Sequence, residues 1–467
     1  MTKIGLVTSC SAVLCAIVLA IAAGGVAHAT GPGPVHAAAL GARAFAFGNP
    51  LMEFLRVREV ATSVPCPDDR GLAPINMISS RDGFIAPGEN LVVAPNVDTL
   101  YSMSHLDLAD GPVVLTHPDM GDRYFNFQLM DPYTNVVGYI GSRTTGSSAG
   151  SFAITWSGAT SPEIPGTTTV TVPYRNIWLL GRTLAGNEAD RARAFALMSQ
   201  YELTPPSGPS APADCTPSAP VEPPELQGIA LLNAMNDAMA QNPPPARDEA
   251  ELADLARIGV GPGLRVADAG LGPVALDALD RSVRASAAAL PSVVSGAQYA
   301  SAIRHDGWAS PPSTIGNYGT DYVTRAAVAE IGLGANTPEE AAYSTAFLDR
   351  RGRPLDGSRN YRLHFEPGLE PPTDAFFSIT VYDGNGLLPT VPGGRHSVSD
   401  SRPDLVYRPD GSIDVLFARE DPRDAGANWL PVPDGPFRVY LRMYVPQSTA
   451  LDGSWSPPGI ELLNGGW

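Results

Sequence analysis

The chain has 467 residues, with 31 Lys and Arg against 48 Asp and Glu, and its formal net charge is −17 at pH 7. So acidic a chain is repelled by nucleic acid and by anionic membrane surfaces, which argues against both as main partners. The length allows two or three domains, each with a hydrophobic core.

The first 29 residues have the features of a secretory signal peptide. Met1 to Lys3 is basic, the run from Ile4 to Ala23 is almost wholly apolar, and Ala27-His28-Ala29 has the small-x-small pattern of a cleavage site. The apolar run is also about as long as a membrane span, so an uncleaved anchor stays open as the alternative. With cleavage after Ala29 we expect a secreted, periplasmic or cell-envelope protein without stable membrane insertion.

Cys66 and Cys215 are the cysteines left after such cleavage, and both lie in loops rich in Pro and Asp. Since exported proteins fold under oxidising conditions, we predict a disulfide between them.

The N-terminal half divides into three segments. Residues 36–90 begin with apolar residues at helical spacing, interrupted by Gly48-Asn49-Pro50, and continue as loop. Residues 91–203 contain short strand-like runs separated by Gly, Pro, Asn and Asp, which is typical of an antiparallel β-sandwich or barrel. The runs are LVVAP, GPVVLTH, DRYFNFQLM, GSFAITW, TTTVTV and NIWLLGRT. A helix with Asn187 as its N-cap is expected over 186–202.

The C-terminal half follows a Pro-rich linker at 204–224. Helical patterns dominate 225–334, which predicts an α-helical insert, and strands resume within the C-terminal β-domain, 335–467. The expected strands there are YRLHF, DAFFSITVYD, SIDVLFA and FRVYLRMYV.

Two segments of the chain are weakly repeated. Asp122–Asp131 and Asp374–Asp383 both begin with Asp, have Phe at the fourth position and end with Asp at the tenth. We interpret them as equivalent strands of two similar β-domains, with chance similarity as the alternative.

Alternation along the first of these segments separates two faces. Phe125, Phe127 and Leu129 lie on the core face with Arg123, and the other face is polar but rich in aromatic rings. That second face consists of Tyr124, Asn126, Gln128 and Met130. Exposure to solvent is the favoured interpretation of this face, and a cleft is the alternative.

The stretch NVDTLYS, Asn96 to Ser102, carries more hydrogen-bonding groups than a turn requires. Asp98 is a candidate general base or cation ligand, and Arg123 a candidate for binding a carboxylate or phosphate. We expect Asp98, Arg123 and Asp131 to meet in one cleft as catalytic residues. Asn96, Tyr101 and Gln128 would bind the ligand beside them.

Other motifs have both a structural and a functional interpretation. Gly146 to Gly150 matches the G-x-S-x-G nucleophile elbow, but a strand rather than a helix follows Ser148, which favours a plain loop. The Asp383-Gly-Asn-Gly386 stretch is a candidate calcium loop, with a hairpin turn as the favoured interpretation. No histidine spacing typical of zinc sites occurs, so no cofactor is expected, although a loop-bound divalent cation such as calcium stays open.

Gly316 to Tyr322 opens the last helix of the insert. Thr320 is the expected N-cap, and Asp321 can pair with Arg325 one turn later. Capping does not explain Asn317 and Tyr318, so we count both as candidate ligand-binding residues.

Several ordered motifs resemble a bacterial, exported family that combines domain of unknown function 1254 with domain of unknown function 1214. The first domain is indicated by Pro95–Ser102, Gly121–Tyr124, Arg143–Gly146 and Leu180–Thr183, and the second by Asn317–Tyr322, Leu355–Gly357, Asn428–Pro431 and Gly435–Phe437. The resemblance spans about residues 40 to 465. His105 departs from the pattern, where an apolar aromatic residue is expected.

The resemblance implies an α+β fold of two antiparallel jelly-roll-like β-sandwich domains with an α-helical insert between them, and it implies no settled activity. From the residues we expect an exported protein that binds, or hydrolyses, a small polar or glycan- or lipid-derived ligand in a polar cleft of the N-terminal β-domain. If it is an enzyme, a hydrolase is the expected type. The alternative is a non-enzymatic cell-envelope or surface protein with a structural or interaction role. Its oligomeric state cannot be read from the sequence.

Overall fold

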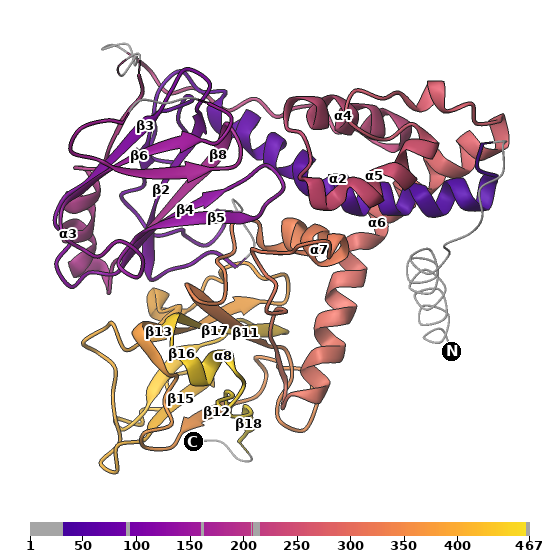
Figure 1. The fold of residues 1–467 in the computed structure, drawn as a ribbon. Helices are drawn as coiled ribbons and strands as arrows, with labels where there is room; N and C mark the ends of the chain where they lie inside the picture. The colour runs from indigo at the N-terminus through magenta and orange to yellow at the C-terminus, as the bar shows by residue number, and fades with distance from the viewer. Residues whose placement is uncertain (1–30, 90–93, 160–162, 207, 209–214, 464–467) are drawn as a thin grey trace, which may run out of the picture.

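The computed structural model describes residues 31–89, 94–159, 163–206, 208 and 215–463. Figure 1 shows three regions: an N-terminal β-domain, a helical region beside it, and a C-terminal β-domain, toward which the long helix α6 descends from the helical region. The fold is mixed α+β with four sheets. The predicted signal peptide lies outside the described residues, as does most of the predicted strand LVVAP.

The helical region combines the N-terminal helix with the insert. Its helices are α2 (Pro34–Thr62), α4 (Gly228–Gln241), α5 (Glu249–Leu255), α6 (Pro273–Arg304) and α7 (Tyr322–Gly332). Their shared core includes Leu40, Phe47, Leu232, Met235 and Leu279. The N-terminal segment is therefore part of the same packed unit as the insert, although more than 160 residues of the chain separate α2 from α4.

Helix α2 runs without a break through Pro50, so the predicted interruption at Gly48-Asn49-Pro50 is wrong. Gly48 serves close packing, since a Cβ there would lie 2.6 Å from the sulfur of Met235. A buried helix with partners on several sides tolerates a proline that would break an isolated one.

The N-terminal β-domain has two sheets. The five-stranded sheet has the order β1 (Ser79–Ser80), β2 (Thr99–Asp107), β8 (Asn176–Leu184), β4 (Phe125–Met130) and β5 (Val136–Gly141). The four-stranded sheet has the order β7 (Thr168–Val172), β6 (Gly150–Trp156), β3 (Val113–His117) and β9 (Glu202–Thr204). Helix α3 (Glu188–Met198) follows β8, and Asn187 caps it as predicted by accepting a hydrogen bond from the Asp190 N–H.

The C-terminal β-domain repeats this arrangement. Its five-stranded sheet has the order β10 (Trp308–Ala309), β11 (Ala341–Ala346), β17 (Phe437–Pro446), β13 (Thr373–Asp383) and β14 (Ser397–Ser399). Its four-stranded sheet has the order β16 (Asn428–Pro431), β15 (Ile413–Ala418), β12 (Tyr361–Phe365) and β18 (Glu461–Leu462), and the short helix α8 (Ser448–Leu451) follows β17.

Position by position, the two domains have the same strand order. The repeated segments form β4 and β13, each the fourth strand of its five-stranded sheet, which confirms that they are equivalent. The expectation of purely antiparallel sheets is wrong in one respect, because β6 pairs with β7, and β15 with β16, in parallel. The chain between β6 and β7 is long enough to return to the same end of the sheet, as parallel pairing requires.

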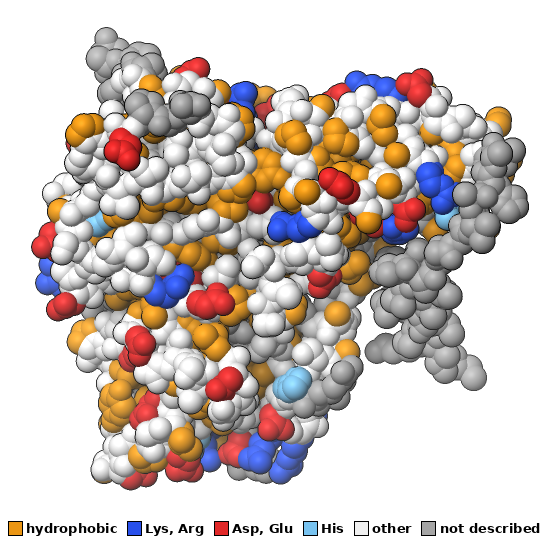
Figure 2. All heavy atoms as spheres, viewed as in Figure 1, with side chains coloured by type: hydrophobic (Ala, Val, Ile, Leu, Met, Phe, Trp, Pro, Cys, Tyr) orange, Lys and Arg blue, Asp and Glu red, His pale blue; other side chains and the backbone are white. Residues whose placement is uncertain are grey.

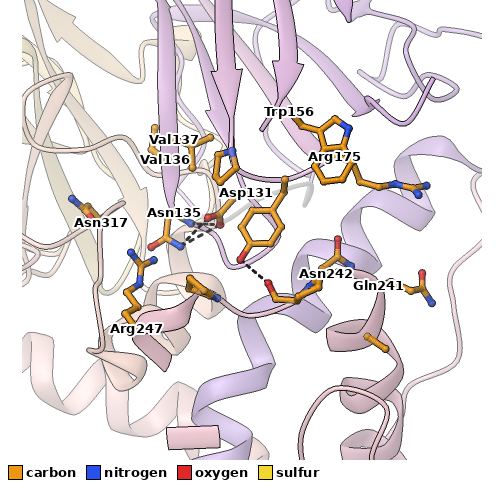
Figure 3. A pocket seen from close by; sticks show the side chains of 15 residues that line it. Asp131, Asn135, Val136, Val137, Trp156, Arg175, Gln241, Asn242, Arg247 and Asn317 are labelled. Carbon is orange, nitrogen blue, oxygen red and sulfur yellow. Dashed lines mark hydrogen bonds between the residues drawn. The ribbon is translucent and has the colours of Figure 1, made fainter. Parts of the chain in front are cut away.

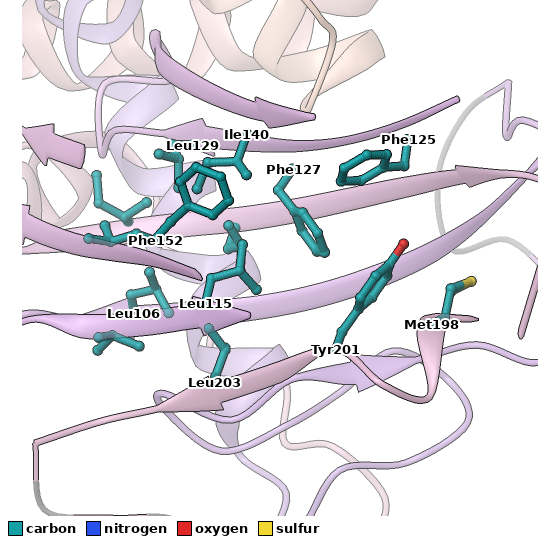
Figure 4. Packing of buried hydrophobic residues seen from close by; sticks show 14 of the residues in the cluster. Leu106, Leu115, Phe125, Phe127, Leu129, Ile140, Phe152, Met198, Tyr201 and Leu203 are labelled. Carbon is teal, nitrogen blue, oxygen red and sulfur yellow. The ribbon is translucent and has the colours of Figure 1, made fainter. Parts of the chain in front are cut away.

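Alternation on β4 gives the predicted core face. Phe125, Phe127 and Leu129 pack with residues of the second sheet, such as Leu115 and Phe152, in the core shown in Figure 4. The opposite face is also buried, because Tyr124, Asn126 and Gln128 are at most 4% exposed. The prediction that this polar face meets solvent is therefore wrong: it is covered by the linker into β11 and by the C-terminal β-domain. The jelly-roll topology stays a prediction.

The start of α7 differs from expectation. Asp321, not Thr320, is the N-cap, and its carboxylate accepts a hydrogen bond from the Thr324 N–H. Arg325 turns into the core and donates to the Phe47 carbonyl, so the proposed pairing with Asp321 is wrong. Three aromatic rings surround its guanidinium group and make this inward position favourable.

Cys66 and Cys215 form the predicted disulfide, with a Cα–Cα distance of 5.9 Å. The bond ties the loop after α2 to the linker that leads to α4. Over the ranges that the structure describes, no helix is long and apolar enough to cross a bilayer. Figure 2 shows acidic and basic side chains scattered singly over the visible face, without a large patch of one sign.

Candidate functional site

The three expected catalytic residues do not share a cleft. Arg123 forms a two-bond ion pair with Asp190 of α3, at 2.7 and 2.8 Å, and Asp98 pairs with Arg402 at 3.0 Å. Asp131 lies beyond the other end of β4, roughly 25 Å from Arg123 at the rise of an extended strand. The expected meeting of these residues is therefore wrong.

Asp98 is sealed between the two β-domains. It has no exposed surface, and its Oδ1 accepts hydrogen bonds from Ser397 and Arg402 of the C-terminal domain. Its backbone N–H donates to the Asn96 side chain at 2.6 Å. This carboxylate fastens the first motif to the C-terminal domain.

The expected ligand-binding residues separate into two groups. Asn96, Tyr101 and Gln128 lie between the facing five-stranded sheets, where Gln128 accepts a hydrogen bond from Arg182 and donates to the Ala335 carbonyl. Asn317 instead lies at the boundary of the N-terminal β-domain and the helical region, close to Asp131.

That boundary holds a cavity of about 720 Å³. Figure 3 shows its walls: the hairpin between β4 and β5, the end of β6, the chain that leads into β8, and the C-terminal end of α4 with the prolines that follow. The lining residues are Asp131, Asn135, Val136, Val137, Trp156, Pro173, Tyr174, Arg175, Ala240, Gln241, Asn242, Pro243, Pro245, Arg247 and Asn317. A volume of this size suits a small organic molecule.

Asp131 belongs to the hairpin wall. Its carboxylate accepts bonds from both the backbone N–H and the side-chain amide of Asn135, at 2.9 to 3.2 Å. Burial raises the pKa of Asp131 to about 6, because the hydrogen bonds from Asn135 only partly offset the loss of solvent. Thr134 in the turn has φ of 61°, which a β-branched residue seldom adopts. The turn is thus held in a demanding conformation at the edge of the cavity.

Two buried polar atoms in the wall have no hydrogen-bond partner among the described residues. They are Oδ1 of Asn135, an acceptor, and Nε1 of Trp156, a donor. The Trp156 ring folds over Gly158, where a Cβ would lie 2.0 Å from the ring, so this position requires glycine. Two residues of the cavity wall thus each keep one polar atom without a partner, an acceptor on Asn135 and a donor on Trp156, and Trp156 also contributes an aromatic ring.

The other polar and aromatic side chains at the cavity come from other segments of the chain. Tyr174 donates a hydrogen bond to the Pro243 carbonyl at 3.0 Å and so joins the β-domain to the helical region. Arg247 and Asn317 are exposed at the mouth. Tyr318, the neighbour of Asn317, points inward and is 4% exposed; burial raises its pKa to about 12.

The sequence alone did not indicate three residues that line the cavity: Trp156, Tyr174 and Asn135. Each belongs to a different segment of the chain, and only the folded domain boundary brings them together. The aromatic residue at the end of a strand before a Ser-Gly turn was the one available signal, and it is too common to single out a site.

Two other sequence candidates have structural roles. His105 lies between Phe54 and Trp178, with its ring stacked on Trp178 at 5.6 Å, and burial lowers its pKa to about 3. It is a neutral core residue. Ser148 is exposed in the turn between β5 and β6, without the following helix that a nucleophile elbow needs.

The calcium candidate forms a turn. Asp383 Oδ1 accepts hydrogen bonds from the backbone N–H groups of Asn385 and Leu387. Among the described residues, no group of three or more His, Cys, Asp or Glu is placed to hold a metal ion.

One similar solved structure supports the fold and gives no activity. The VPA0106 protein of Vibrio parahaemolyticus has 22% sequence identity and a TM-score of 0.66, over 92% of this chain and all of that chain. An uncharacterised protein of Burkholderia cenocepacia has 12% identity and a TM-score of 0.45, over 90% of this chain and 88% of that one. Vicilin of Vicia faba is 32% identical over 120 residues, 24% of this chain, and the match spans only 25% of vicilin.

Two family models match in the expected order. "Protein of unknown function (DUF1254)" covers residues 75–205, and "Protein of unknown function (DUF1214)" covers residues 340–448. These ranges enclose most strands of the N-terminal and C-terminal β-domains. The chain belongs to the family in which domain of unknown function 1254 precedes domain of unknown function 1214.

Proposed function

We propose that this protein is exported and binds a small carbohydrate in the cavity between the N-terminal β-domain and the helical region. The observation that carries the proposal is the pair of unpartnered polar atoms, Asn135 Oδ1 and Trp156 Nε1, in the wall of a 720 Å³ cavity. A sugar has hydroxyl groups that both donate and accept, so one ligand can satisfy both atoms.

The other walls fit the same chemistry. A pyranose ring has apolar C–H faces, and the rings of Trp156 and Tyr174 provide apolar surfaces with polar ends. Arg247, Gln241 and Asn317 at the mouth supply exposed hydrogen-bonding groups that can set orientation. The disulfide supports export, since such bonds persist in oxidising compartments.

Binding is favoured over hydrolysis. Most glycosidases use two carboxyl groups that flank the scissile bond. Among the described lining residues Asp131 alone carries a carboxyl group, and Asn135 occupies both of its oxygens. We therefore assign Asp131 a structural role in the wall of the cavity.

Calorimetric titration of the mature protein with glucose, galactose, N-acetylglucosamine, glucuronate and maltose tests the proposal. At least one sugar is expected to bind with a dissociation constant in the millimolar range or tighter, and Trp156→Ala is expected to abolish the signal. Trp455→Ala, which removes a partly buried indole from the C-terminal domain, is the matched control. Absence of binding by the wild type, or equal binding by folded Trp156→Ala protein, contradicts the proposal.

A structural role at the cell envelope is the second candidate. It is favoured by the sealed Asp98, which links the two β-domains through Arg402 and Ser397. A protein that withstands heat and denaturant but binds none of these sugars would fit this alternative.

A further inference from the structure

The two β-domains place an arginine at the same position of equivalent central strands. Arg182 lies on β8 and pairs across the sheet with Tyr101 of β2. Arg442 lies on β17 and pairs across the sheet with Tyr343 of β11. Strands β8 and β17 are both the third strand of their sheets, and β2 and β11 are both the second. The two Arg–Tyr pairs therefore occupy equivalent positions in the two halves of the protein.

The halves also share a hydrogen-bonding pattern. The backbone N–H of Asn96 donates to the Tyr101 phenolic oxygen at 3.4 Å, and the backbone N–H of Asn336 donates to that of Tyr343 at 3.2 Å. In both cases a loop asparagine before the strand fixes the tyrosine through its oxygen. The phenolic hydrogens therefore stay available as donors.

A third tyrosine, Tyr444, lies near both arginines and is held in the same manner. We refer to these tyrosines and the two arginines as the cluster. The side-chain amide of Asn96 donates to the Tyr444 oxygen. Among the described residues, none accepts a hydrogen bond from Tyr101, Tyr343 or Tyr444. Ser378, which faces Arg442 across the β13–β17 pair, adds a fully buried hydroxyl without a partner in the same part of the chain.

Both arginines are buried cations with neutral partners. Arg182 is 7% exposed and Arg442 is 4% exposed. Arg182 donates to Gln128, to Asn336 and to the Gly334 carbonyl, and Arg442 to Thr380 and the Ala94 carbonyl. No described carboxylate lies within ion-pair distance of either guanidinium group.

Other arginines near this interface differ in that respect. Arg402 pairs with Asp98 at 3.0 Å, and Arg143 pairs with Glu340 at 2.6 Å. A buried cation without a counter-ion is unfavourable, and two such cations in one interface leave the balancing negative charge unaccounted for among the described side chains.

The neighbouring phenols do not supply that charge. Burial raises the pKa of Tyr444 well above its usual value, and the nearby guanidinium groups of Arg442 and Arg182 only partly offset this effect, so this phenol is neutral at pH 7.

The tyrosines form the more exposed side of this cluster. Tyr101, Tyr343 and Tyr440 are each partly exposed, while the arginines behind them are buried. The Tyr101 ring lies 5.9 Å from the Arg182 guanidinium, and the Tyr440 ring 5.2 Å from that of Arg442. Each ring therefore packs against one of the two cations.

We propose that a small oxyanion, the terminal carboxylate or phosphate group of a ligand, binds between Arg182 and Arg442 and accepts hydrogen bonds from the hydroxyl groups of Tyr101, Tyr343 and Tyr444. Guanidinium groups and phenols are the donors that such anions prefer. This anion site is separate from the carbohydrate cavity, because its residues lie between the two β-domains and none of them lines that cavity.

Thermal unfolding and calorimetry of the full mature chain test this site with inorganic phosphate and with acetate, against chloride at equal ionic strength. Binding of phosphate, acetate or both by the wild type is expected, and their relative affinities distinguish a phosphate from a carboxylate ligand. Phosphate also stabilises folded proteins non-specifically, so the readout is the difference between wild type and variants.

The variants Tyr101→Phe and Tyr343→Phe keep the rings and remove one donor each. Each is expected to weaken anion binding by about tenfold, as loss of a hydrogen bond to a charged group does. Tyr361→Phe is the matched control, because the Tyr361 oxygen also accepts a backbone N–H, from Asp356, but lies in the C-terminal core. Arg442→Gln, if folded, is expected to abolish binding.

Two results overturn the proposal. One is a wild-type protein that binds neither phosphate nor acetate beyond the chloride baseline. The other is anion binding that is equally strong in folded Tyr101→Phe, Tyr343→Phe and Tyr361→Phe proteins. Sugar binding, measured with Trp156→Ala, is an independent readout, so either site can fail without the other.

Discussion

Arg123 and Asp190 form a two-bond ion pair that joins the start of β4 to helix α3. The carboxylate also accepts the Gly186 N–H, and both side chains are 16% exposed. Because Arg123 also donates to the Leu184 carbonyl, this pair fixes the corner where β8 ends and α3 begins. The position of Arg123 is thus set by the fold rather than by a ligand.

Asp190→Asn should lower the stability of the protein at neutral pH. Hydrogen bonds to Arg123, which are the largest cause, hold the pKa of Asp190 well below its ordinary value of 3.8. Such a carboxylate contributes stability above pH 4, and that stability is lost as the pH falls through the folded pKa. We expect a loss of about 1–2 kcal/mol in urea unfolding at pH 7 for a partly buried pair. A difference between wild type and variant that persists unchanged at pH 2 would contradict this assignment.

His105→Phe should protect the protein against acid. Burial lowers the pKa of His105 to about 3, against 6.5 when unfolded, so the unfolded state binds more protons between these values. Stability is therefore lost as the pH falls from 6.5 toward 3, and the variant removes this source of loss. Denaturant unfolding at pH 4.5 and pH 7.5 measures it: the variant should gain relative to wild type at pH 4.5 by on the order of 1–2 kcal/mol. An equal effect at both pH values would show altered packing instead.

Much of the fold follows from local pattern. Alternation on β4 put Phe125, Phe127 and Leu129 into the core, and the repeat of Asp, Phe and Asp paired β4 with β13. Both signals depend on strand geometry alone. Strand β2 was not predicted, because Thr99 to Asp107 alternates little between polar and apolar residues, having both faces buried.

The candidate site could be predicted from the sequence less well than the fold. The distance between Arg123 and Asp131 was already implied by eight residues of extended chain, so their separation could have been inferred. The stretch Asn317–Tyr322 is similar to NVDTLYS in composition, but strand order places the counterpart of NVDTLYS at β11, with Tyr343 in the position of Tyr101. The helix cap at Asp321 produced a similar composition for a different physical reason.

The interdomain arginines show what one sequence cannot supply. Arg182 and Arg442 are ordinary alternating residues of strongly apolar strands. Their lack of a counter-ion becomes visible only once two sheets, more than 200 residues apart in the chain, are packed face to face.

Reduction of the Cys66–Cys215 disulfide should destabilise the protein without changing its fold. The bond closes a loop with a sequence separation of 149, so breaking it gives the unfolded chain considerable freedom. A loss of about 2–5 kcal/mol is expected for Cys66→Ser with Cys215→Ser. Thermal unfolding with and without dithiothreitol measures it. The double variant serves as the control, because it should not respond to the reductant; a wild type equally unaffected would show that the bond contributes little.

Asp131→Asn should change how stability depends on pH. Burial is the main reason that the pKa of Asp131 rises from 3.8 to about 6, so the folded state holds its proton over a range in which the unfolded state has lost it. Stability attributable to this group therefore decreases as the pH rises from about 4 to 6 and is constant above that.

In the variant, this decrease should disappear. The introduced amide can keep the bond from the Asn135 backbone through its oxygen, and its nitrogen can donate to the Asn135 oxygen that now lacks a partner. Urea unfolding at pH 4, 5, 6 and 7 should show a smaller slope for Asp131→Asn, with a relative gain of about 2 kcal/mol at pH 7. Asp383→Asn, at a partly exposed turn of the other domain, is the control. Identical slopes for wild type and Asp131→Asn would mean that Asp131 is charged in the folded protein at pH 5, and would favour a role for its carboxylate in contact with a ligand.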